Sequence, residues 1–322
     1  MSSRPSSFAL TSPGKLRLYS TQELLRLPPP EYLIDGILPA GGLVGLYGPP
    51  NHGKSFAAVD MALSVATGRP WQGHPTKQGY VIYVAAEGGV GMSKRVRAWV
   101  TEYAVDAKFA AVAWLTQALP IQSDSADMNT LFERINDEIN EQPALVIIDT
   151  LARCFDGDEN MQEDMGKFIG GVDRLRREFD ATVIVVHHTR LDADRERGST
   201  AFRGAADTMI GVKQERKTGV ITFTCDKQKD DESFASMDVR LKVVTDTKSC
   251  VIVGVAQEAT TAILAAIRKA GSLGIGFKEL QAHCSGLTIS PATLKRRLVS
   301  LNESGQIIKD SRLYFDIHAH GN

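Results

Sequence analysis

Short apolar runs alternate with amphipathic stretches between residues 36 and 257. Four runs are apolar throughout and rich in β-branched residues, as strands buried on both faces must be: residues 43–47, 79–85, 144–149 and 182–187. Helical periodicity fills the intervals, at residues 54–67, 90–104, 127–141 and 161–179. Strand–helix alternation of this kind predicts a parallel sheet with helices on both faces.

After Ala205 the apolar runs lie closer together. Short turns such as Lys217-Thr218-Gly219 join four strand-like segments, DTMIGVKQ, GVITFTC, MDVRLKVV and CVIVGV. Close spacing with turn residues between the runs predicts antiparallel strands that extend the sheet.

The pattern changes again near Glu258. Three helical segments, TTAILAAIRKA, FKELQAHC and SPATLKRRLVSLNES, precede a two-stranded ribbon, GQIIKDSRLYFDI. Ser290 and Pro291 are suited to the N-cap and first position of the third helix. Three helices followed by a hairpin predict a small winged helix-turn-helix.

The N-terminal residues are rich in Ser and Pro, and Ser20 to Leu25 resembles a short capped helix. The predicted fold class is therefore α/β, with a mostly parallel sheet. Its expected parts are an N-terminal arm (1–35), partly disordered, a core of alternating strands and helices (36–257) and a winged-helix domain (258–322).

Composition excludes some classes of protein. No apolar run approaches the roughly 18–20 residues needed to cross a bilayer, and the N-terminus has no apolar leader segment. The four cysteines show no CxxC spacing, which argues against a zinc site or disulfide framework and predicts a cytoplasmic protein without a membrane partner. The net charge is −1, but residues 258–322 carry eight Lys/Arg against five Asp/Glu.

A glycine-rich loop lies between the first buried strand and the first helix, in the spacing Gly48-x₄-Gly53-Lys54-Ser55. Backbone N–H groups of such a loop converge on phosphates, the lysine reaches the β- and γ-phosphates, and the serine hydroxyl binds Mg²⁺. The alternative is a chance match in a Gly/Pro-rich turn. The residues expected to bind ATP are Gly48, Pro49, Pro50, Asn51, His52, Gly53, Lys54, Ser55 and Phe56.

Two carboxylates supply the chemistry that hydrolysis requires. Asp149 ends a buried strand and is predicted to bind Mg²⁺ together with Ser55, although it can instead cap the next turn. Glu87 directly follows residues 79–85, which we expect to be the strand next to the P-loop strand. Glu87 is predicted to deprotonate the attacking water; the alternative is a solvated turn residue.

His187 and His188 end the strand at residues 182–187. Neighbouring residues on a strand face opposite sides, so one histidine faces the site and the other packs. We expect His188 to contact the γ-phosphate and transmit its loss to the following loop. A metal-ligand role for the pair is the alternative.

These residues, taken in order, resemble the RecA/DnaB superfamily. More narrowly, the chain is similar to the RepA-like hexameric helicases of plasmids and to related phage ATPases, the AAA_25 type. The resemblance covers about residues 20–230. The segments that carry it are LLRLPPPEYLIDGILPAGGLVGLYGPP, GYVIYVAAEGG, VIIDTLAR, VVHHTR and GSTAFRGAAD.

The resemblance implies a RecA-like ring with ATP at subunit interfaces and basic residues supplied by the neighbouring subunit. The matching positions are Lys227 and Lys229. Many relatives carry Lys-x-Arg, so a lysine stands where an arginine finger is expected, and it offers a point charge rather than a bidentate fork. A solvated charged turn is the alternative.

Two regions are candidates for DNA contact. Residues 189–204 form a polar loop after the histidines, which in a RecA-like ring lines the central channel; its basic residues are Arg190, Arg195, Arg197 and Arg203. Acidic residues interleave with them, so a mobile loop without a ligand is the alternative. On the third C-terminal helix, DNA contact is predicted for Lys295, Arg296 and Arg297, with docking to protein as the alternative.

The function expected from the sequence is an ATP- and Mg²⁺-dependent DNA helicase or translocase in plasmid or phage replication. The expected partners are single-stranded or forked DNA, further copies of the chain in a hexamer, and a primase or other replication proteins. Two alternatives remain. One is a DNA-binding ATPase without unwinding, such as a recombination mediator or annealing protein, and the other is an ATP-switched replication regulator.

Overall fold

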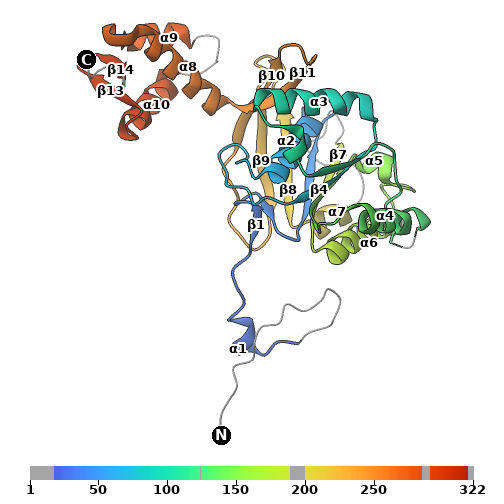
Figure 1. Cartoon of the computed structure of the whole chain (residues 1–322). Coiled ribbons are helices and arrows are strands. Elements are labelled where there is room, and N and C mark those ends of the chain that lie inside the picture. Colours follow the sequence, from blue (N-terminus) through green and yellow to red (C-terminus); the bar gives the residue numbers. More distant parts are fainter. Residues whose placement is uncertain (1–17, 124, 189–199, 285–290, 318–322) are drawn as a thin grey trace. The chain divides into compact units, whose positions relative to one another are not determined.

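The computed structural model describes residues 18–123, 125–188, 200–284 and 291–317. Its main element is a nine-stranded sheet in the order β11-β10-β9-β8-β3-β7-β6-β4-β5 (Figure 1). The strands are β3 (Leu43–Gly48), β4 (Tyr80–Ala85), β5 (Val112–Leu115), β6 (Pro143–Asp149), β7 (Thr182–His188), β8 (Thr208–Gln214), β9 (Ile221–Gln228), β10 (Met237–Val244) and β11 (Ser249–Gly254).

The four strands predicted from their apolar runs are parallel, as expected: β3 pairs with β7, β7 with β6, and β6 with β4. The short strand β5, which the sequence pattern does not predict, pairs with β4 in parallel. The prediction of antiparallel pairing after Ala205 is confirmed for β9 and β10 but is wrong for β8, which lies parallel to β3. Between β7 and β8 the chain forms an additional helix, α7 (Thr200–Ala205), and such a crossover allows the next strand to run parallel.

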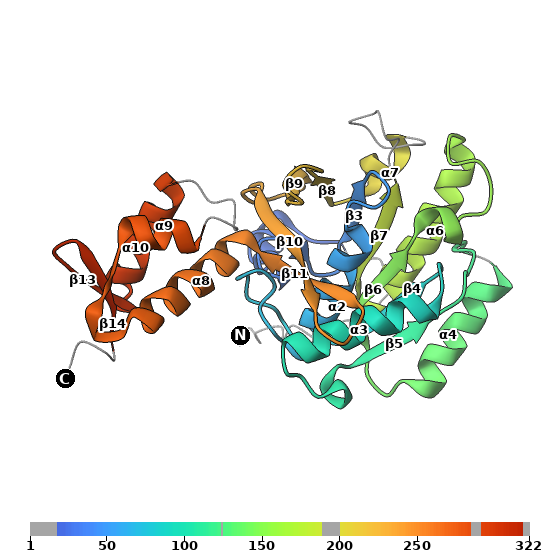
Figure 2. The same ribbon diagram turned by 90° about the horizontal axis from the view of Figure 1, so that it is seen from above.

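Helices cover both faces of the parallel strands. They are α2 (Lys54–Thr67), α3 (Gly89–Glu102), α4 (Ala126–Glu138), α5 (Leu151–Cys154) and α6 (Gln162–Phe179). Side chains alternate along each strand, so Ile82 and Val84 of β4 join the core formed with α4 and α6, while α2 packs on the opposite face. Figure 2 shows α4 and α6 on one side of these strands and α2 and α3 on the other.

The N-terminal segment contains the predicted capped helix, α1 (Thr21–Leu24), and a small antiparallel pair, β1 (Tyr32–Ile34) and β2 (Leu38–Pro39). The Ser20 side chain accepts the N–H of Glu23, and the Glu23 carboxylate accepts the N–H of Ser20 at 2.9 Å. This reciprocal pair is a capping box, which satisfies two backbone donors at the start of the helix.

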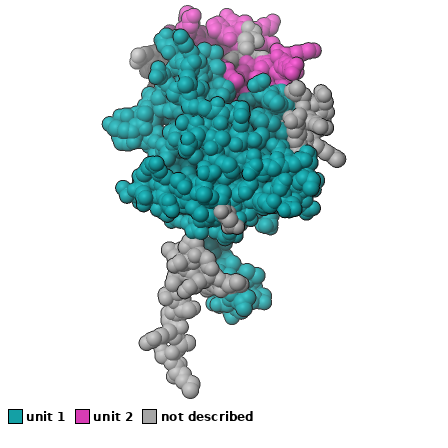
Figure 3. Space-filling model, turned by 90° about the vertical axis from the view of Figure 1, so that its right-hand side faces the viewer, with its two compact units in different colours: residues 1–213, 224–236, 243–251 teal, residues 214–223, 237–242, 252–322 magenta. Residues whose placement is uncertain are grey.

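The chain divides into two compact units, coloured separately in Figure 3. The first comprises residues 1–213, 224–236 and 243–251, and the second comprises residues 214–223, 237–242 and 252–322. The second unit contains α8 (Val255–Ala270), α9 (Phe277–His283), α10 (Pro291–Glu303), β12 (Ile275–Gly276), β13 (Ile307–Asp310) and β14 (Leu313–Asp316). The three strands form a sheet in the order β12-β14-β13.

The core of the C-terminal elements includes one face of α10, where Leu294, Leu298 and Leu301 are buried. The predicted helices and ribbon are therefore present, while the winged helix-turn-helix assignment stays a prediction. Nor is the boundary at residue 258 tested, although α8 begins at Val255. Within the described ranges, no helix combines the length and apolar character that a membrane span requires.

One buried carboxylate joins α2 to α3. Asp60 of α2 is 3% exposed, and it accepts hydrogen bonds from the Trp99 indole at 2.8 Å and the Gln72 amide at 3.2 Å. Burial raises the pKa of Asp60 to about 6 from an ordinary value of 3.8, although the hydrogen bonds oppose the shift.

We therefore expect stability to fall as Asp60 ionises. Its folded pKa of about 6 exceeds 3.8, so the folded state binds the proton more tightly. The stabilisation is complete below pH 3.8 and is lost as the pH rises through 6, by up to about 3 kcal/mol. Urea unfolding measures the free energy of unfolding of the native protein and of Asp60→Asn. Between pH 4 and pH 7 the native protein should lose stability relative to the variant. A difference independent of pH would contradict the assignment.

Candidate nucleotide-binding site

The P-loop joins the end of β3 to the start of α2, as the sequence predicts. A side chain at Gly48 would place its Cβ 2.1 Å from the backbone oxygen of Val212, so only glycine fits there. Gly53 precedes the helix with a φ of 89°, a left-handed conformation that favours glycine. Because the loop leads directly into α2, the N–H groups of the first helical turn point toward the phosphate site.

The lysine of the motif lies inside the loop. Lys54 is 3% exposed, and its Nζ donates to the backbone oxygens of Gly48 at 2.8 Å and Pro49 at 2.7 Å. Burial lowers the pKa of Lys54 to about 8, while the carboxylates of Asp149 and Glu87 oppose that shift. Both carboxylates therefore favour the charged form of the Lys54 ammonium.

Asp149, at the end of β6, meets the serine of the P-loop. Its Oδ1 accepts a hydrogen bond from Ser55 Oγ at 3.1 Å, and its Oδ2 accepts one from the Tyr83 hydroxyl at 2.7 Å. Asp149 is 4% exposed; burial raises its pKa, and the hydrogen bonds from Tyr83 and Ser55 act in the opposite direction.

The donor set fits Mg²⁺. A hydroxyl and a carboxylate supply the hard oxygen ligands that this ion prefers, and it is commonly held by one or two such groups together with phosphate oxygens. Among the described residues, no cluster of three or more His, Cys, Asp or Glu side chains forms an all-protein metal site. Ser55 and Asp149 would thus hold Mg²⁺, which neutralises phosphate charge when bound.

Glu87 faces the same site from the loop after β4. A cavity of about 380 Å³ is lined by Ser55, Glu87, Arg95 and Asp149, together with small and apolar residues of segment 85–92. The expectation that β4 neighbours the P-loop strand is wrong, because β7 and β6 lie between β3 and β4. Glu87 still reaches the cavity, since the carboxyl ends of parallel strands share one edge of the sheet.

The two histidines at the end of β7 face different surroundings. His188 is half-buried, and its pKa is lowered first by burial and then by the charge of Lys54. His187 is 2% exposed, and its Nε2 lies 3.5 Å from the carboxylate of Glu159. His188 stands opposite Gly48 of the P-loop in the register of β7 with β3, and its sensor role stays a prediction.

Two residues near this site, Tyr83 and Arg95, are not predicted from the sequence. Tyr83 belongs to β4, where its phenol is hidden in an apolar run. Arg95 belongs to α3, lines the cavity, and places its guanidinium 4.7 Å from the centre of the Phe56 ring. A hydroxyl inside an otherwise apolar strand is a signal, but β4 contains both Tyr80 and Tyr83, so it does not single out Tyr83; the sequence offers nothing comparable for Arg95.

The two candidate trans lysines lie on and just after β9, and neither lines the cavity. Lys227 Nζ donates to three backbone oxygens around the end of α7, at 2.5–3.1 Å: those of Arg203, Gly204 and Ala206. Lys229 is more exposed, at 58% of its side chain, and its Nζ lies 3.7 Å from the carboxylate of Asp207. Lys229 is therefore the better placed of the two to reach a neighbouring subunit.

The candidate DNA contacts are only partly described. Arg190, Arg195 and Arg197 lie outside the described residues. Arg203, on α7, is exposed and donates to the backbone oxygen of Asp226 at 3.1 Å. On α10, Lys295 and Arg296 are exposed, and Arg297, beside the buried leucines, is half-buried.

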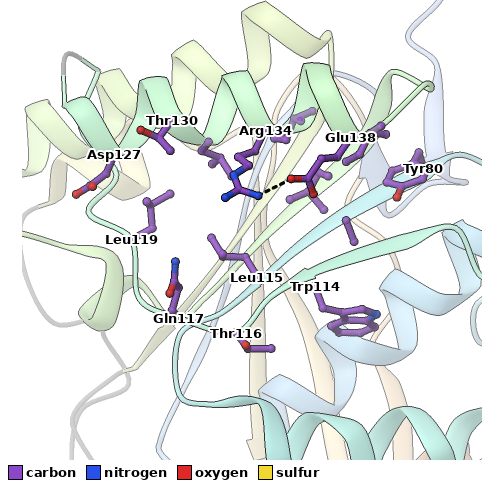
Figure 4. A pocket seen from close by; sticks show the side chains of 15 residues that line it. Tyr80, Trp114, Leu115, Thr116, Gln117, Leu119, Asp127, Thr130, Arg134 and Glu138 are labelled. Atoms are coloured by element: carbon purple, nitrogen blue, oxygen red, sulfur yellow. Dashed lines mark hydrogen bonds and ion pairs between the residues drawn. The ribbon is translucent and has the colours of Figure 1, made fainter.

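A second cavity, of about 580 Å³, lies between α4 and the strands β4 and β5, of which β5 is at the edge of the sheet (Figure 4). Leu115 and Leu119 line it together with polar side chains of α4, and the Arg134–Glu138 ion pair spans one turn of that helix. It shares no lining residue with the nucleotide cavity, and nothing in its lining identifies a ligand.

The fold and the site define a P-loop nucleotide-binding protein of the RecA-like type. The model of one family, AAA_25, described as an AAA domain, matches residues 15–194, more than half of the chain. The chain therefore belongs to this family, and its P-loop places it among the P-loop ATPases.

Comparison with solved structures finds a likeness to the crystal structure of the RadB recombinase, with 16% identity and a TM-score of 0.48. The match covers 67% of this chain and 92% of that one. No curated protein matches the sequence.

Proposed function

We propose that this chain is an ATP-driven DNA translocase or helicase that acts as a hexameric ring in plasmid or phage replication. The observation that carries the proposal is the meeting of Lys54, Ser55, Asp149, Glu87 and His188 at one edge of the sheet. A phosphate-binding lysine, a metal pair, a base and a sensor are the parts that coupled hydrolysis requires.

Each residue has a separate task in the proposed reaction. Lys54 holds the β- and γ-phosphates, and Ser55 with Asp149 holds Mg²⁺. Glu87 orients the attacking water and takes its proton. His188 lies at the end of β7, directly before residues 189–199, so loss of the γ-phosphate there is transmitted to the segment that contains Arg190, Arg195 and Arg197.

Unwinding of a forked duplex tests the proposal against its alternatives. Strand separation that requires ATP supports a helicase. ATP-dependent DNA binding without separation would favour a recombination mediator or annealing protein. Sequence-specific binding would favour a replication regulator. Negative-stain microscopy with ATP and single-stranded DNA gives the assembly, because a ring supports translocation and a filament or monomer argues against it.

We expect the α10 cations to contribute to DNA affinity without entering hydrolysis. Substituting alanine for Lys295, Arg296 and Arg297 together should weaken DNA binding. The slope of log K against log salt should also become shallower, by about 1 for each DNA phosphate that these cations neutralise in the native complex. Fluorescence anisotropy over a salt series measures both effects.

The matched control is alanine at three cations of the first unit that are exposed in the structure, Lys108, Lys167 and Arg177. That variant should keep the native slope, and both variants should retain DNA-independent ATPase. An unchanged slope in the α10 variant would assign this helix to protein contacts.

A further inference from the structure

The hydroxyl of Tyr83 contacts the carboxylate of Asp149, which we expect to bind Mg²⁺. Tyr83 is fully buried, with no exposed surface, and its hydroxyl donates to Asp149 Oδ2 at 2.7 Å. Tyr83 and Asp149 are 66 residues apart in sequence and meet because β4 and β6 are neighbouring strands. A buried hydroxyl needs a hydrogen-bond partner, and here that partner is a carboxylate with its own role in the site.

Tyr83 lies between two neighbouring strands, and its ring packs against Trp114 of one of them. Tyr83 stands opposite Ile147 of β6 and opposite Trp114 of β5. The Tyr83 and Trp114 ring centres are 4.9 Å apart at an angle of 32°, and the Trp114 side chain appears in Figure 4. A ring fixed in this way presents its hydroxyl in one place.

The two oxygens of Asp149 therefore have different partners. Oδ2 is bound to Tyr83, and Oδ1 accepts from Ser55, the other residue expected to hold Mg²⁺. Rotation of the carboxylate would break the bond to Tyr83, so the hydroxyl selects the orientation in which Oδ1 faces Ser55. Tyr83 does not line the nucleotide cavity, so it acts on bound nucleotide only through Asp149.

We propose that Tyr83 is a positioning residue that orients Asp149 for Mg²⁺ bound with ATP. The proposal rests on the nucleotide and metal site described above. Hydrogen-bonded partners of metal ligands affect metal affinity by about 10- to 100-fold when they are removed. Tyr83 supplies this bond through a side chain that the P-loop motif does not include.

Tyr83→Phe removes the hydroxyl and keeps the ring. We expect the variant to need at least about tenfold more Mg²⁺ for half-maximal binding of a fluorescent ATP analogue. Its affinity for the same analogue in EDTA should equal that of the native protein, since the phosphate contacts of the P-loop are unchanged. The control is Tyr80→Phe, a half-buried tyrosine of the same strand for which no bond to Asp149 exists among the described contacts.

A double-mutant cycle separates positioning from packing. In an Asp149→Asn background, Tyr83→Phe should add no further change in Mg²⁺ requirement, because the carboxylate on which it acts is gone. Equal losses in Mg²⁺ and EDTA, a full additional effect in that background, or an unfolded Tyr83→Phe protein would each assign a structural role and overturn the proposal. Native protein without Mg²⁺-dependent nucleotide binding would instead overturn the proposed function itself.

Discussion

Glu87→Gln is expected to leave ATP bound while turnover falls at least about 10²-fold, the scale of a lost general base. Glutamine keeps the size of the side chain and its ability to contact water, but it cannot accept the proton. Glu87 lines the cavity with Ser55 and Asp149, but among the described contacts it takes no part in the hydrogen bonds of Lys54 to the P-loop backbone or of Ser55 to Asp149. The variant should therefore lose ATP hydrolysis while it keeps its affinity for ATP.

Steady-state ATPase and equilibrium binding of a fluorescent ATP analogue measure the two effects. Lys54→Ala is the comparison, because it removes the buried ammonium that we expect to hold the phosphates, and it should abolish binding itself. Native turnover in Glu87→Gln would show that another group activates the water. Loss of ATP-analogue binding in the same variant would show that Glu87 contributes to nucleotide binding and not only to the hydrolysis step.

Mixing Lys229→Ala with Lys54→Ala subunits is expected to restore part of the ATPase that each lacks alone. If Lys229 acts across an interface, the first variant retains an intact P-loop and the second retains an intact lysine. A basic residue supplied in trans contributes about 10³-fold or more in phosphoryl transfer, so a few mixed interfaces should exceed both inactive backgrounds. Rescue should increase with protein concentration because it requires assembly.

The structure makes Lys229 the better choice for this test. Lys227 is bound to three backbone oxygens around the end of α7, so its removal would also disturb that helix. Lys229 is 58% exposed and has one carboxylate at 3.7 Å. Absence of rescue, under conditions in which mixed oligomers demonstrably form, would place Lys229 in its own subunit or outside catalysis and would weaken the ring proposal.

Local patterns predicted much of the fold. The helix predicted at residues 54–67 is observed at Lys54–Thr67, and the strand predicted at residues 144–149 is observed at Pro143–Asp149. Strands buried on both faces and long amphipathic helices leave strong signals, because each requires a continuous pattern of apolar residues. The strand β5 left a weak signal, since its four residues are only half-buried.

The sequence by itself determined the P-loop and the strand and helix that the loop connects, because Gly48 to Ser55 are contiguous and their strand–loop–helix order is local. It did not determine which strands are neighbours. Apolar runs that are buried on both faces are interchangeable, so nothing in them states that β7 and β6 separate β3 from β4.

Only the tertiary structure brought Tyr83 to Asp149 and tied Lys227 to the end of α7. Both contacts join residues far apart in the chain through side-chain geometry that follows from strand order and helix placement. A pattern of apolar and polar positions specifies which face of an element is buried, but the partner of a buried hydroxyl or ammonium depends on the packing of the whole sheet.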